Sequence, residues 1–434
     1  MKKALVITYY WPPSGGAGVQ RWLKFTKYLR GFGWEPVIYT PENPENPEFD
    51  ASLEKDIPEG MQVIRRPIWE PYSIYKRLLG RKKDDRIHAA FTSETRQNRF
   101  LESVSVWIRG NFFIPDARRF WIRPSVRFLV EYLASHPVDV IISTGPPHSM
   151  HLIAKEVSYS VRLPWLADFR DPWTNIDFYK DLRLTNRSDR KHKQLEKEVL
   201  KAATSVTVIS RGMAEDFRRI VSRPYEVITN GFDPDDVQSD KPVVPDTRFS
   251  IAHIGTMSSS RNPVNLWKAL RELIQDTPGL DRDLEIKLVG KVDFSVNQSL
   301  QESGLESFVR RIPYLPHDEV VMCQRQSRVL LLVINNTPNA GMILTGKFFE
   351  YLAAGRPILC IGPEGGDASA ILEETDAGYI ADFQDTVKTK ALVAKLYAEF
   401  RENKIRTPSQ AVNGYSRVGL TGKLADVLNK MTLR

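Results

Sequence analysis

The chain has 434 residues, of which 42% are hydrophobic and 26% charged, a balance typical of soluble globular proteins and not of disordered ones. Lysine and arginine number 61 against 53 acidic residues, which gives a net charge of +8 at pH 7. That excess favours anionic partners such as phosphorylated ligands or acidic lipid, although it serves solubility equally well. Two cysteines, Cys323 and Cys360, exclude a disulfide framework, lack the spacing of a metal site and indicate a reducing compartment.

No stretch of the chain predicts a targeting segment or a membrane span. The apolar run after Lys2 and Lys3 ends after residue 7, too early for the core of a signal peptide. The longest aliphatic run, 329–334, is far below the roughly 20 residues of a spanning helix. We therefore expect a cytoplasmic protein, with peripheral binding to the inner face of the cell membrane left open.

Short β-branched runs alternate with longer amphipathic stretches along the chain. Helical periodicity is clear at 20–31, 264–275, 388–403 and 415–431. Continuous apolar strands separated by helices are typical of parallel sheets covered on both faces. The pattern occurs twice, so the sequence predicts an α/β fold with two doubly wound, Rossmann-like domains. The expected strands are 4–8, 36–40, 61–65, 138–144, 165–169, 205–210 and 225–229, then 249–255, 284–290, 309–314, 329–334, 357–362 and 378–381.

A polar, proline-rich stretch without periodicity, 235–246, marks the expected domain boundary. We expect a first domain over 1–240 and a second over 241–410. Residues 69–127 hold few strand signals but many aromatic and basic residues, which predicts a partly helical insertion in the first domain.

A glycine-rich loop follows the first predicted strand and precedes a helix. Gly15, Gly16 and Gly18 let the backbone take positive φ and approach a ligand, and the helix start beyond them offers unpaired N–H groups to an anion. The spacing is not the G-x-G-x-x-G dinucleotide fingerprint. The loop is either a ligand loop or a plain strand-to-helix turn, and its place at the carboxyl end of the first strand favours the ligand.

Two further polar loops follow strands of the first domain. One carries His148, a candidate hydrogen-bond donor or general acid/base, with a surface histidine of no role as the alternative. The other carries Asp168, Arg170 and Asp171. These either orient substrate hydroxyls or form a buried salt-bridge network without substrate contact.

The second domain offers two motifs. Its first strand leads into a small-residue loop from Thr256 that contains Arg261, and such a loop before a helix can clamp a diphosphate or can be a solvated helix cap. The more specific motif, TGKFFEYLAAGRPI, reads as a loop, a helix starting near Gly346, and a strand. Glu350 falls about one turn into that helix, where a carboxylate can accept both hydroxyls of a ribose. In an ordinary helix Glu350 would be solvated.

Together these motifs resemble glycosyltransferase family 4, the large retaining family with the GT-B fold, in which two Rossmann-like domains face a central cleft. The resemblance spans nearly the whole chain and rests on YYWPPSGGAG, STGPPHS, ADFRDPW, VITNGFD and GKFFEYLAAGRPIL, the last being the most distinctive. The subgroup that it looks like builds bacterial capsule, O-antigen and other surface polysaccharides. The resemblance implies transfer of a sugar, with retention, from a nucleotide sugar to a lipid-linked or saccharide acceptor. It also implies that the last segment, 411–434, forms a helix that packs back on the first domain.

The resemblance also assigns roles. The second domain would bind the donor and the first the acceptor, and no metal or other cofactor is expected, because the leaving phosphate helps to deprotonate the acceptor. Stabilising the departing diphosphate would then be the main catalytic contribution. The expected catalytic residues are His148, Arg261 and Lys347; the donor-binding residues are Gly15, Gly16, Gly18, Thr256, Gly346 and Glu350; and Asp168, Arg170 and Asp171 would orient the acceptor or the sugar.

Two positions depart from the family pattern. The glutamate that is common eight positions before Glu350 is Met342 here, and the arginine that is common after the phosphate-loop glycine is Thr256. These losses motivate one alternative, a non-catalytic nucleotide-sugar-binding subunit that assists another transferase. A sugar-nucleotide epimerase of the same two-domain shape is a second alternative.

Basic residues interleave with aromatics in 69–127, a composition that suits an anionic lipid surface. No recognised nucleic-acid module accompanies them, so nucleic acid is not an expected partner. The alternative is that the aromatics are core and the charges a solvated face. The residues are Lys76, Arg77, Arg81, Lys82 and Lys83 beside Trp69, Tyr72 and Tyr75, then Arg109, Arg118, Arg119, Arg123 and Arg127 among Trp107, Phe112, Phe113, Phe120 and Trp121.

Overall fold

The structure is a computed structural model that describes residues 1–45, 49–70, 104, 106–237, 242–404, 406 and 408–433. The chain divides into two compact units. Unit 1 is Met1–Thr229 together with Leu420–Arg434, and unit 2 is Asn230–Gly419. Each unit is built around its own parallel sheet.

A seven-stranded parallel sheet forms the centre of unit 1, in the order β3-β2-β1-β4-β5-β6-β7. The strand order reverses at β1, because the chain first runs outward to β3 and then returns to pair β4 on the other side of β1. Such a reversal places the loops that follow β1 and β4 next to each other at the carboxyl edge. The strands are β1 (Lys2–Ile7), β2 (Trp34–Pro41), β3 (Gln62–Arg66), β4 (Val140–Gly145), β5 (Trp165–Phe169), β6 (Ser205–Val208) and β7 (Glu226–Val227).

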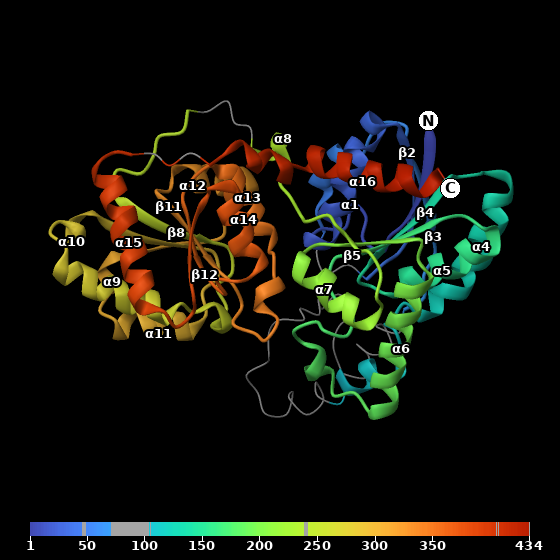
Figure 1. The fold of residues 1–434 in the computed structure, drawn as a ribbon, viewed down its shortest axis with the longest axis horizontal. Helices are drawn as coiled ribbons and strands as arrows, with labels where there is room; N and C mark the ends of the chain where they lie inside the picture. Colours follow the sequence, from blue (N-terminus) through green and yellow to red (C-terminus); the bar gives the residue numbers. More distant parts are fainter. Residues whose placement is uncertain are drawn as a thin grey trace. The chain divides into compact units, whose positions relative to one another are not determined.

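Helices from the two ends of the chain lie together on one face of this sheet (Figure 1). The apolar stripe of α16, including Leu424 and Leu428, shares a hydrophobic cluster with α1 and with Ala4 and Val6 of β1. Helix α5 packs on β1, β4 and β5 and against α4. The helices are α1 (Ala17–Leu29), α4 (Arg119–Ser135), α5 (Ser149–Val161), α6 (Asn186–Ala202), α7 (Arg211–Ile220) and α16 (Arg417–Thr432), with short helices η1 (Arg30–Phe32), η2 (Ala51–Asp56) and η3 (Tyr179–Leu182).

Unit 2 holds a six-stranded parallel sheet in the order β10-β9-β8-β11-β12-β13. Here the order reverses at β8, so the loops after β8 and β11 are the neighbours at the carboxyl edge. The strands are β8 (Phe249–Ile254), β9 (Leu284–Val289), β10 (Val309–Ile312), β11 (Val329–Val333), β12 (Ile358–Ile361) and β13 (Gly378–Ala381).

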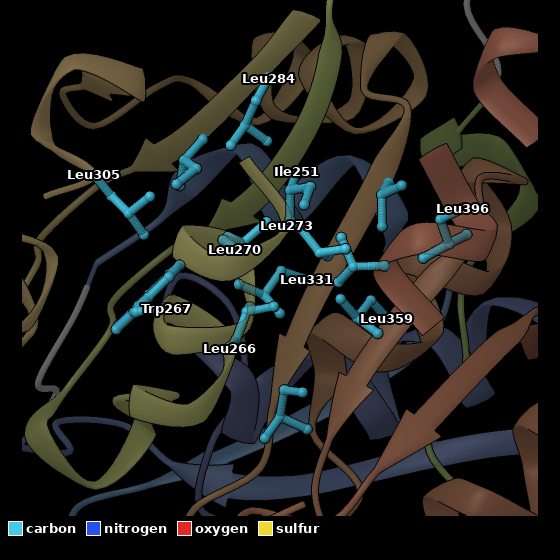
Figure 2. Packing of buried hydrophobic residues seen from close by; sticks show 14 of the residues in the cluster. Ile251, Leu266, Trp267, Leu270, Leu273, Leu284, Leu305, Leu331, Leu359 and Leu396 are labelled. Carbon is cyan, nitrogen blue, oxygen red and sulfur yellow. The ribbon is translucent and has the colours of Figure 1, made fainter. Parts of the chain in front are cut away.

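A leucine-rich core fixes the helices of unit 2 to its sheet (Figure 2). Ile251, Leu331 and Leu359 come from three neighbouring strands and meet the stripe of α9, whose leucines recur every three or four residues, and Leu396 of α15. The helices are α8 (Pro234–Val237), α9 (Val264–Asp276), α10 (Leu280–Asp283), α11 (Phe294–Glu302), α12 (His317–Gln326), α13 (Gly346–Ala354), α14 (Asp367–Thr375) and α15 (Thr386–Arg401), with short helices η4 (Ser259–Arg261), η5 (Glu306–Phe308), η6 (Ala340–Met342) and η7 (Gln410–Tyr415).

Two parallel, doubly wound sheets confirm the predicted fold class. Every strand predicted from the sequence is present, with ends that shift by no more than two residues. No helix in the part of the chain that the structure describes is long and apolar enough to span a bilayer.

Candidate functional site

The glycine loop leads from β1 into α1 at the carboxyl edge of the unit 1 sheet. Gly16 caps the helix with a φ of +83°, a conformation that favours glycine. Because glycine has no side chain to cap the helix, the amides of α1 before Val19 stay open to an anion, whereas the Val19 amide donates to the Gly16 carbonyl at 3.2 Å. Gly18 permits a close approach, since a Cβ there would stand 3.0 Å from Nη1 of Arg170 and 3.0 Å from Cδ2 of Tyr10.

Arg170 joins the glycine loop to the loop after β4. Its Nη1 donates to the Gly18 carbonyl at 2.7 Å, its Nη2 donates to the Pro146 carbonyl, and its backbone N–H donates to the Gly145 carbonyl at 2.9 Å. The side chain is buried, and burial lowers the pKa of the guanidinium. Arg170 therefore fixes the position of one loop relative to the other.

Asp168 is 1% exposed and its carboxylate is fully engaged. It pairs with Arg21 at 2.8 Å and accepts from Trp22 Nε1 at 2.8 Å, Thr144 Oγ1 at 3.0 Å and Thr207 Oγ1 at 2.8 Å. Burial alone would raise the pKa of Asp168, but the Arg21 charge and these hydrogen bonds hold it below its ordinary value. Asp168 thus lies in the buried salt-bridge network that was one of the two expectations for this loop.

Asp171, two residues past the end of β5, differs from Asp168. Its side chain is partly buried, and no other described residue donates a hydrogen bond to its carboxylate. Burial raises the pKa of Asp171, while the neighbouring Arg170 opposes that rise. Of the two carboxylates in this loop, Asp171 is the one free to meet a ligand hydroxyl.

His148 caps α5, and its imidazole is 8% exposed. The ring stacks on Trp173 with centroids 4.3 Å apart and planes within 2°. Its Nδ1 has no hydrogen-bond partner among the described residues. Burial, and then the neighbouring His151, His192 and Arg170, lower the pKa of His148 well below its ordinary value. At neutral pH it is therefore a neutral imidazole, able to donate or accept a hydrogen bond but not to act as a cation.

In unit 2, Lys347 of α13 reaches back over the end of β8. Its Nζ donates to the Thr256 carbonyl at 3.4 Å and lies 3.5 Å from Nε2 of His253. Gly255, with a φ of +103°, makes room for it, because a Cβ there would stand 2.5 Å from Nζ. The ammonium thus lies against the His253 imidazole of β8 and the Thr256 carbonyl of the following loop, in the space that Gly255 leaves open.

Like charges face each other at this edge. Burial and then the charge of Arg261 lower the pKa of Lys347 to about 8, against a weaker opposing effect of Glu350. Burial and the charge of Lys347 lower the pKa of His253 to about 3, so His253 stays neutral and can accept from the ammonium. Arg261 itself is oriented by Asn335, whose Oδ1 accepts from its Nε at 2.5 Å. A bound anion would relieve the repulsion between Arg261 and Lys347.

The start of α13 adds backbone donors to these two cations. Thr345 is the N-cap residue, but its side chain makes no capping hydrogen bond, and its Oγ1 has no partner among the described residues. The Phe348 amide donates to the Thr345 carbonyl at 3.2 Å, so the amides of Gly346 and Lys347 are the ones left open to an anion.

Glu350 lies one helical turn beyond Gly346 and is partly exposed. Its Oε2 accepts a hydrogen bond from Nε2 of the buried Gln324 at 3.3 Å. The next residue, Tyr351, is fully buried and accepts from the backbone N–H of Ile254 at 3.0 Å, which anchors α13 to the end of β8. The Glu350 carboxylate is thus held one turn along α13 from Gly346 and Lys347.

The predicted residues fall into two groups, one at the carboxyl edge of each sheet. Unit 1 brings together the glycine loop, His148, Asp168, Arg170 and Asp171. Unit 2 brings together Thr256, Arg261, Gly346, Lys347 and Glu350, while Met342 ends η6 in the segment that precedes α13. No group of three or more histidine, cysteine, aspartate or glutamate side chains among the described residues could hold a metal ion.

Several supporting residues escaped the sequence reasoning. His253 is a histidine inside the apolar strand FSIAHI, and Arg21 is an arginine inside the apolar helix segment VQRWLKF. A polar residue in such an apolar run is a signal that could have singled out both. Trp173 is the last residue of the ADFRDPW motif, but nothing in the sequence indicates what its side chain contacts. Gln324 left no signal, because nothing local distinguishes it from a solvated helical glutamine.

No protein-family model matches the chain, and no curated protein matches it. Solved structures do match over nearly its full length. An Anabaena protein, HepE in complex with UDP-glucose, has a TM-score of 0.59 at 13% identity, covering 99% of this chain and 100% of that one. The lipopolysaccharide outer core galactosyltransferase WaaB in its apo form has a TM-score of 0.59 at 11% identity, covering 99% of both chains. A putative UDP-N-acetylglucosamine 2-epimerase from Listeria monocytogenes has a TM-score of 0.51 at 10% identity, covering 99% of this chain and 96% of that one. The fold is therefore GT-B-like, the fold of nucleotide-sugar glycosyltransferases.

Proposed function

We propose that this chain is a glycosyltransferase that takes a sugar from a nucleotide-sugar donor and transfers it, with retention, to a lipid-linked or saccharide acceptor in the synthesis of a cell-surface polysaccharide. The observation that carries this proposal is the arrangement at the start of α13. Lys347 lies in the first turn of α13 beside the open amides, the charge of Arg261 from the loop after β8 acts on its ammonium, and Glu350 follows one turn later. A diphosphate matches the cations and the amides, and a ribose matches the carboxylate. The UDP-glucose bound to the HepE structure is consistent with such a donor.

The chemistry then follows from charge. When the bond between the sugar and the diphosphate breaks, negative charge grows on the departing phosphate, and Arg261, Lys347 and the α13 amides stabilise it. The same phosphate accepts the proton of the acceptor hydroxyl, so no protein nucleophile takes part. His148, as a neutral imidazole, donates a hydrogen bond to the transferred sugar, and Asp171 orients a hydroxyl.

Calorimetric titration with a panel of nucleoside diphosphates tests the donor site. We expect one of them to bind, and Lys347→Ala to weaken that binding at least tenfold, because a charged hydrogen bond is worth about 1.5–3 kcal/mol. Lys268→Ala, which removes an exposed lysine of α9 in the same unit, is the matched control and should bind as the wild type does. If no nucleoside diphosphate binds, the donor site is wrong.

Glu350→Ala should weaken binding of the same nucleoside diphosphate by about 1.5–3 kcal/mol, the usual value of a hydrogen bond to a charged group. Because the ribose carries these hydrogen bonds, binding of inorganic pyrophosphate should not change. Equal loss for both ligands would mean that Glu350 supports the phosphate loop and not the ribose.

His148→Ala should lower turnover and leave nucleoside-diphosphate affinity nearly intact, because His148 belongs to unit 1 whereas the nucleotide is assigned to unit 2. Steady-state rates and titration of the same preparation separate the two effects. Full turnover in the variant would exclude a role for His148 in transfer.

An epimerase is the alternative function to test, because a putative UDP-N-acetylglucosamine 2-epimerase has a similar fold. Incubation with the preferred nucleotide sugar distinguishes the readings. A transferase releases nucleoside diphosphate and slowly forms free sugar when no acceptor is present. An epimerase returns an isomeric nucleotide sugar, and a non-catalytic subunit leaves the donor unchanged.

An exposed surface of unit 1 supports the proposal of a membrane-side acceptor. Some of the aromatic and basic residues near 69–127 are structural: Trp121 is buried and stacks on Tyr39 at 5.0 Å, and Arg118 pairs with Glu70 at 3.0 Å. Others are exposed and contact one another, as Trp69 does with Phe120 and Trp107 with Phe112. We call the exposed set the aromatic-basic surface: Trp69, Trp107, Phe112, Phe120, Arg109, Arg119, Arg123 and Arg127. Lys76, Arg77, Arg81, Lys82, Lys83, Tyr72 and Tyr75 lie outside the described residues.

A further inference from the structure

Trp173 has no assigned role, yet its ring lies nearer to the His148 ring than those of His151 and Phe169 do. The two rings lie parallel, 2° apart in plane and 4.3 Å between centroids, and both are buried. Trp173 belongs to the loop after β5, whereas His148 is the residue just before α5, so two separate segments meet in this stack. A stacked ring constrains the plane of its partner without using either imidazole nitrogen.

Helix α6 holds Trp173 in place through two of its own side chains. The indole Nε1 donates to Nδ1 of His192 at 3.1 Å, and the backbone N–H donates to Oε1 of Glu196 at 3.2 Å. Glu196 also accepts from the backbone N–H and the hydroxyl of Thr174, at 3.2 and 2.6 Å. His192 and Glu196 are four residues apart on one helix, so they present a single face to the loop.

The Nδ1 atom of His148 is buried and has no hydrogen-bond partner among the described residues. Its Nδ1 lies 3.2 Å from the place where a Cβ of Gly145 would stand, and the His151 ring lies 5.8 Å away between centroids. Gly145 is needed for this packing, because a Cβ there would stand 2.5 Å from Nε2 of His151. With Nδ1 enclosed, Nε2 is the nitrogen through which His148 can meet a ligand.

We propose that Trp173, seated by His192 and Glu196 of α6, is a positioning residue that fixes the plane of the His148 imidazole and directs its Nε2 toward the ligand. Its link to turnover rests on the function proposed above. The geometry of the ring does not, and can be measured without any substrate. A loosely held ring costs rate because a displacement of about 1 Å at a reacting group can cost on the order of 100-fold.

Trp173→Leu and Trp173→Phe test this inference together. Leucine removes the ring, whereas phenylalanine keeps a stacking face and loses only the donor to His192. Trp34→Leu is the matched control, since it removes a buried tryptophan of unit 1 at the amino end of β2, away from His148. Each variant is compared with the wild type for thermal unfolding, nucleoside-diphosphate affinity, turnover, and the pH titration of His148 by NMR of histidine-labelled protein.

We expect Trp173→Leu to lower turnover roughly 10- to 100-fold with unchanged nucleoside-diphosphate affinity, and to move the His148 titration toward that of a free imidazole. Trp173→Phe should lose less than Trp173→Leu in both measurements, and because it keeps the ring it should fold even where leucine does not. In a His148→Ala background, Trp173→Leu should cause no further loss of turnover. Trp34→Leu should change stability alone.

An unchanged His148 titration in a folded Trp173→Leu protein would overturn the inference, as would an equal loss of turnover with His148 present or absent. A protein without transferase activity whose His148 signal still moves would sink the proposed function and leave the positioning role intact.

Discussion

At the scale of single residues, the polar side chains at the two sheet edges are of two kinds. Asp168 has its charge and its hydrogen bonds matched inside unit 1, by Arg21 above all, and such groups hold a structure together. At the start of α13, the ammonium of Lys347 instead experiences the like charge of Arg261, from the loop after β8, which lowers its pKa. An arrangement of that kind costs stability, and proteins keep it at sites that bind an opposite charge. A carboxylate matched by an opposite charge is therefore part of the scaffold, whereas a partly buried ammonium near a like charge is what we expect of a binding site.

Lys347 gives a prediction with a definite sign. In the free protein its pKa is about 8, lowered from 10.5 by burial and by Arg261. A bound diphosphate favours the charged ammonium and raises that pKa, so the complex keeps a proton that the free protein loses above pH 8. Affinity should therefore be flat from pH 7 to 8 and fall above it, approaching tenfold per unit. The terminal phosphate, with a pKa of about 6, stays ionised throughout this range.

Titrations in buffers of different ionisation enthalpy check this linkage, because proton uptake on binding appears directly in the measured heat. Lys347→Arg is the control, since a guanidinium keeps its charge over the same range. Its affinity should be lower, because its larger head must pass Gly255, but independent of pH. A wild-type affinity that does not change between pH 7 and 9.5 would exclude the lowered pKa.

The site residues could be predicted only in part, and for a physical reason. Glu350 and the glycine loop could be predicted because their proposed roles depend only on their distance along the chain from the start of a helix. The state of Asp168 depends on Arg21 and Thr207, which are 147 and 39 residues away along the chain. No local pattern shows which of two carboxylates in the sequence DFRD will be matched by such remote partners.

At the scale of elements, the strands were predictable because a strand buried on both faces must be a continuous apolar run, and that requirement is local. Their order is not local: β1 pairs with both β2 and β4, and only the general preference of alternating βα units for a doubly wound sheet predicts it. Helix α16 shows the same limit. Its periodicity predicts a helix, but its partners, α1 and β1, lie at the other end of the chain.

A substitution in α16 tests how much unit 1 depends on that packing. Leu428 is fully buried against the α1 side of the sheet, so Leu428→Ala should destabilise unit 1 by about 2–5 kcal/mol. Asp426→Ala, two residues earlier on the exposed side of the same helix, is the control and should cost well under 1 kcal/mol. Hydrogen exchange of the α1 amides reports the effect, because α1 shares the cluster. Unchanged protection of α1 in Leu428→Ala would mean that α16 adds little to unit 1.

At the scale of the whole molecule, the net charge of +8 draws the protein toward anionic surfaces but does not choose one. We propose that the aromatic-basic surface selects a membrane among these anionic surfaces. Phe112 is 59% exposed, Trp69 54% and Phe120 46%, and Arg119 lies 5.6 Å from the Phe120 ring centre. Exposed aromatic rings are costly in water and settle at the headgroup level of a bilayer, where neighbouring arginines meet lipid phosphate. A lipid-linked acceptor would then be within reach of the enzyme that uses it.

Liposome sedimentation tests this placement. Vesicles rich in anionic lipid should bind the protein at low salt and release it as salt rises, whereas neutral vesicles should not bind it, because each basic residue near the surface contributes on the order of 1 kcal/mol that salt screens. Replacing Phe112 and Phe120 together by alanine should weaken binding to anionic vesicles at every salt concentration, since the rings contribute independently of charge. Tyr159→Ala removes an aromatic ring of α5 that is 86% exposed and does not belong to the aromatic-basic surface, and it should bind as the wild type does. If the wild type, the Phe112 and Phe120 double variant and Tyr159→Ala all bind equally, net charge alone accounts for the attraction. If the wild type binds anionic and neutral vesicles equally, the case for a membrane-side acceptor is removed. Neither result bears on the donor site.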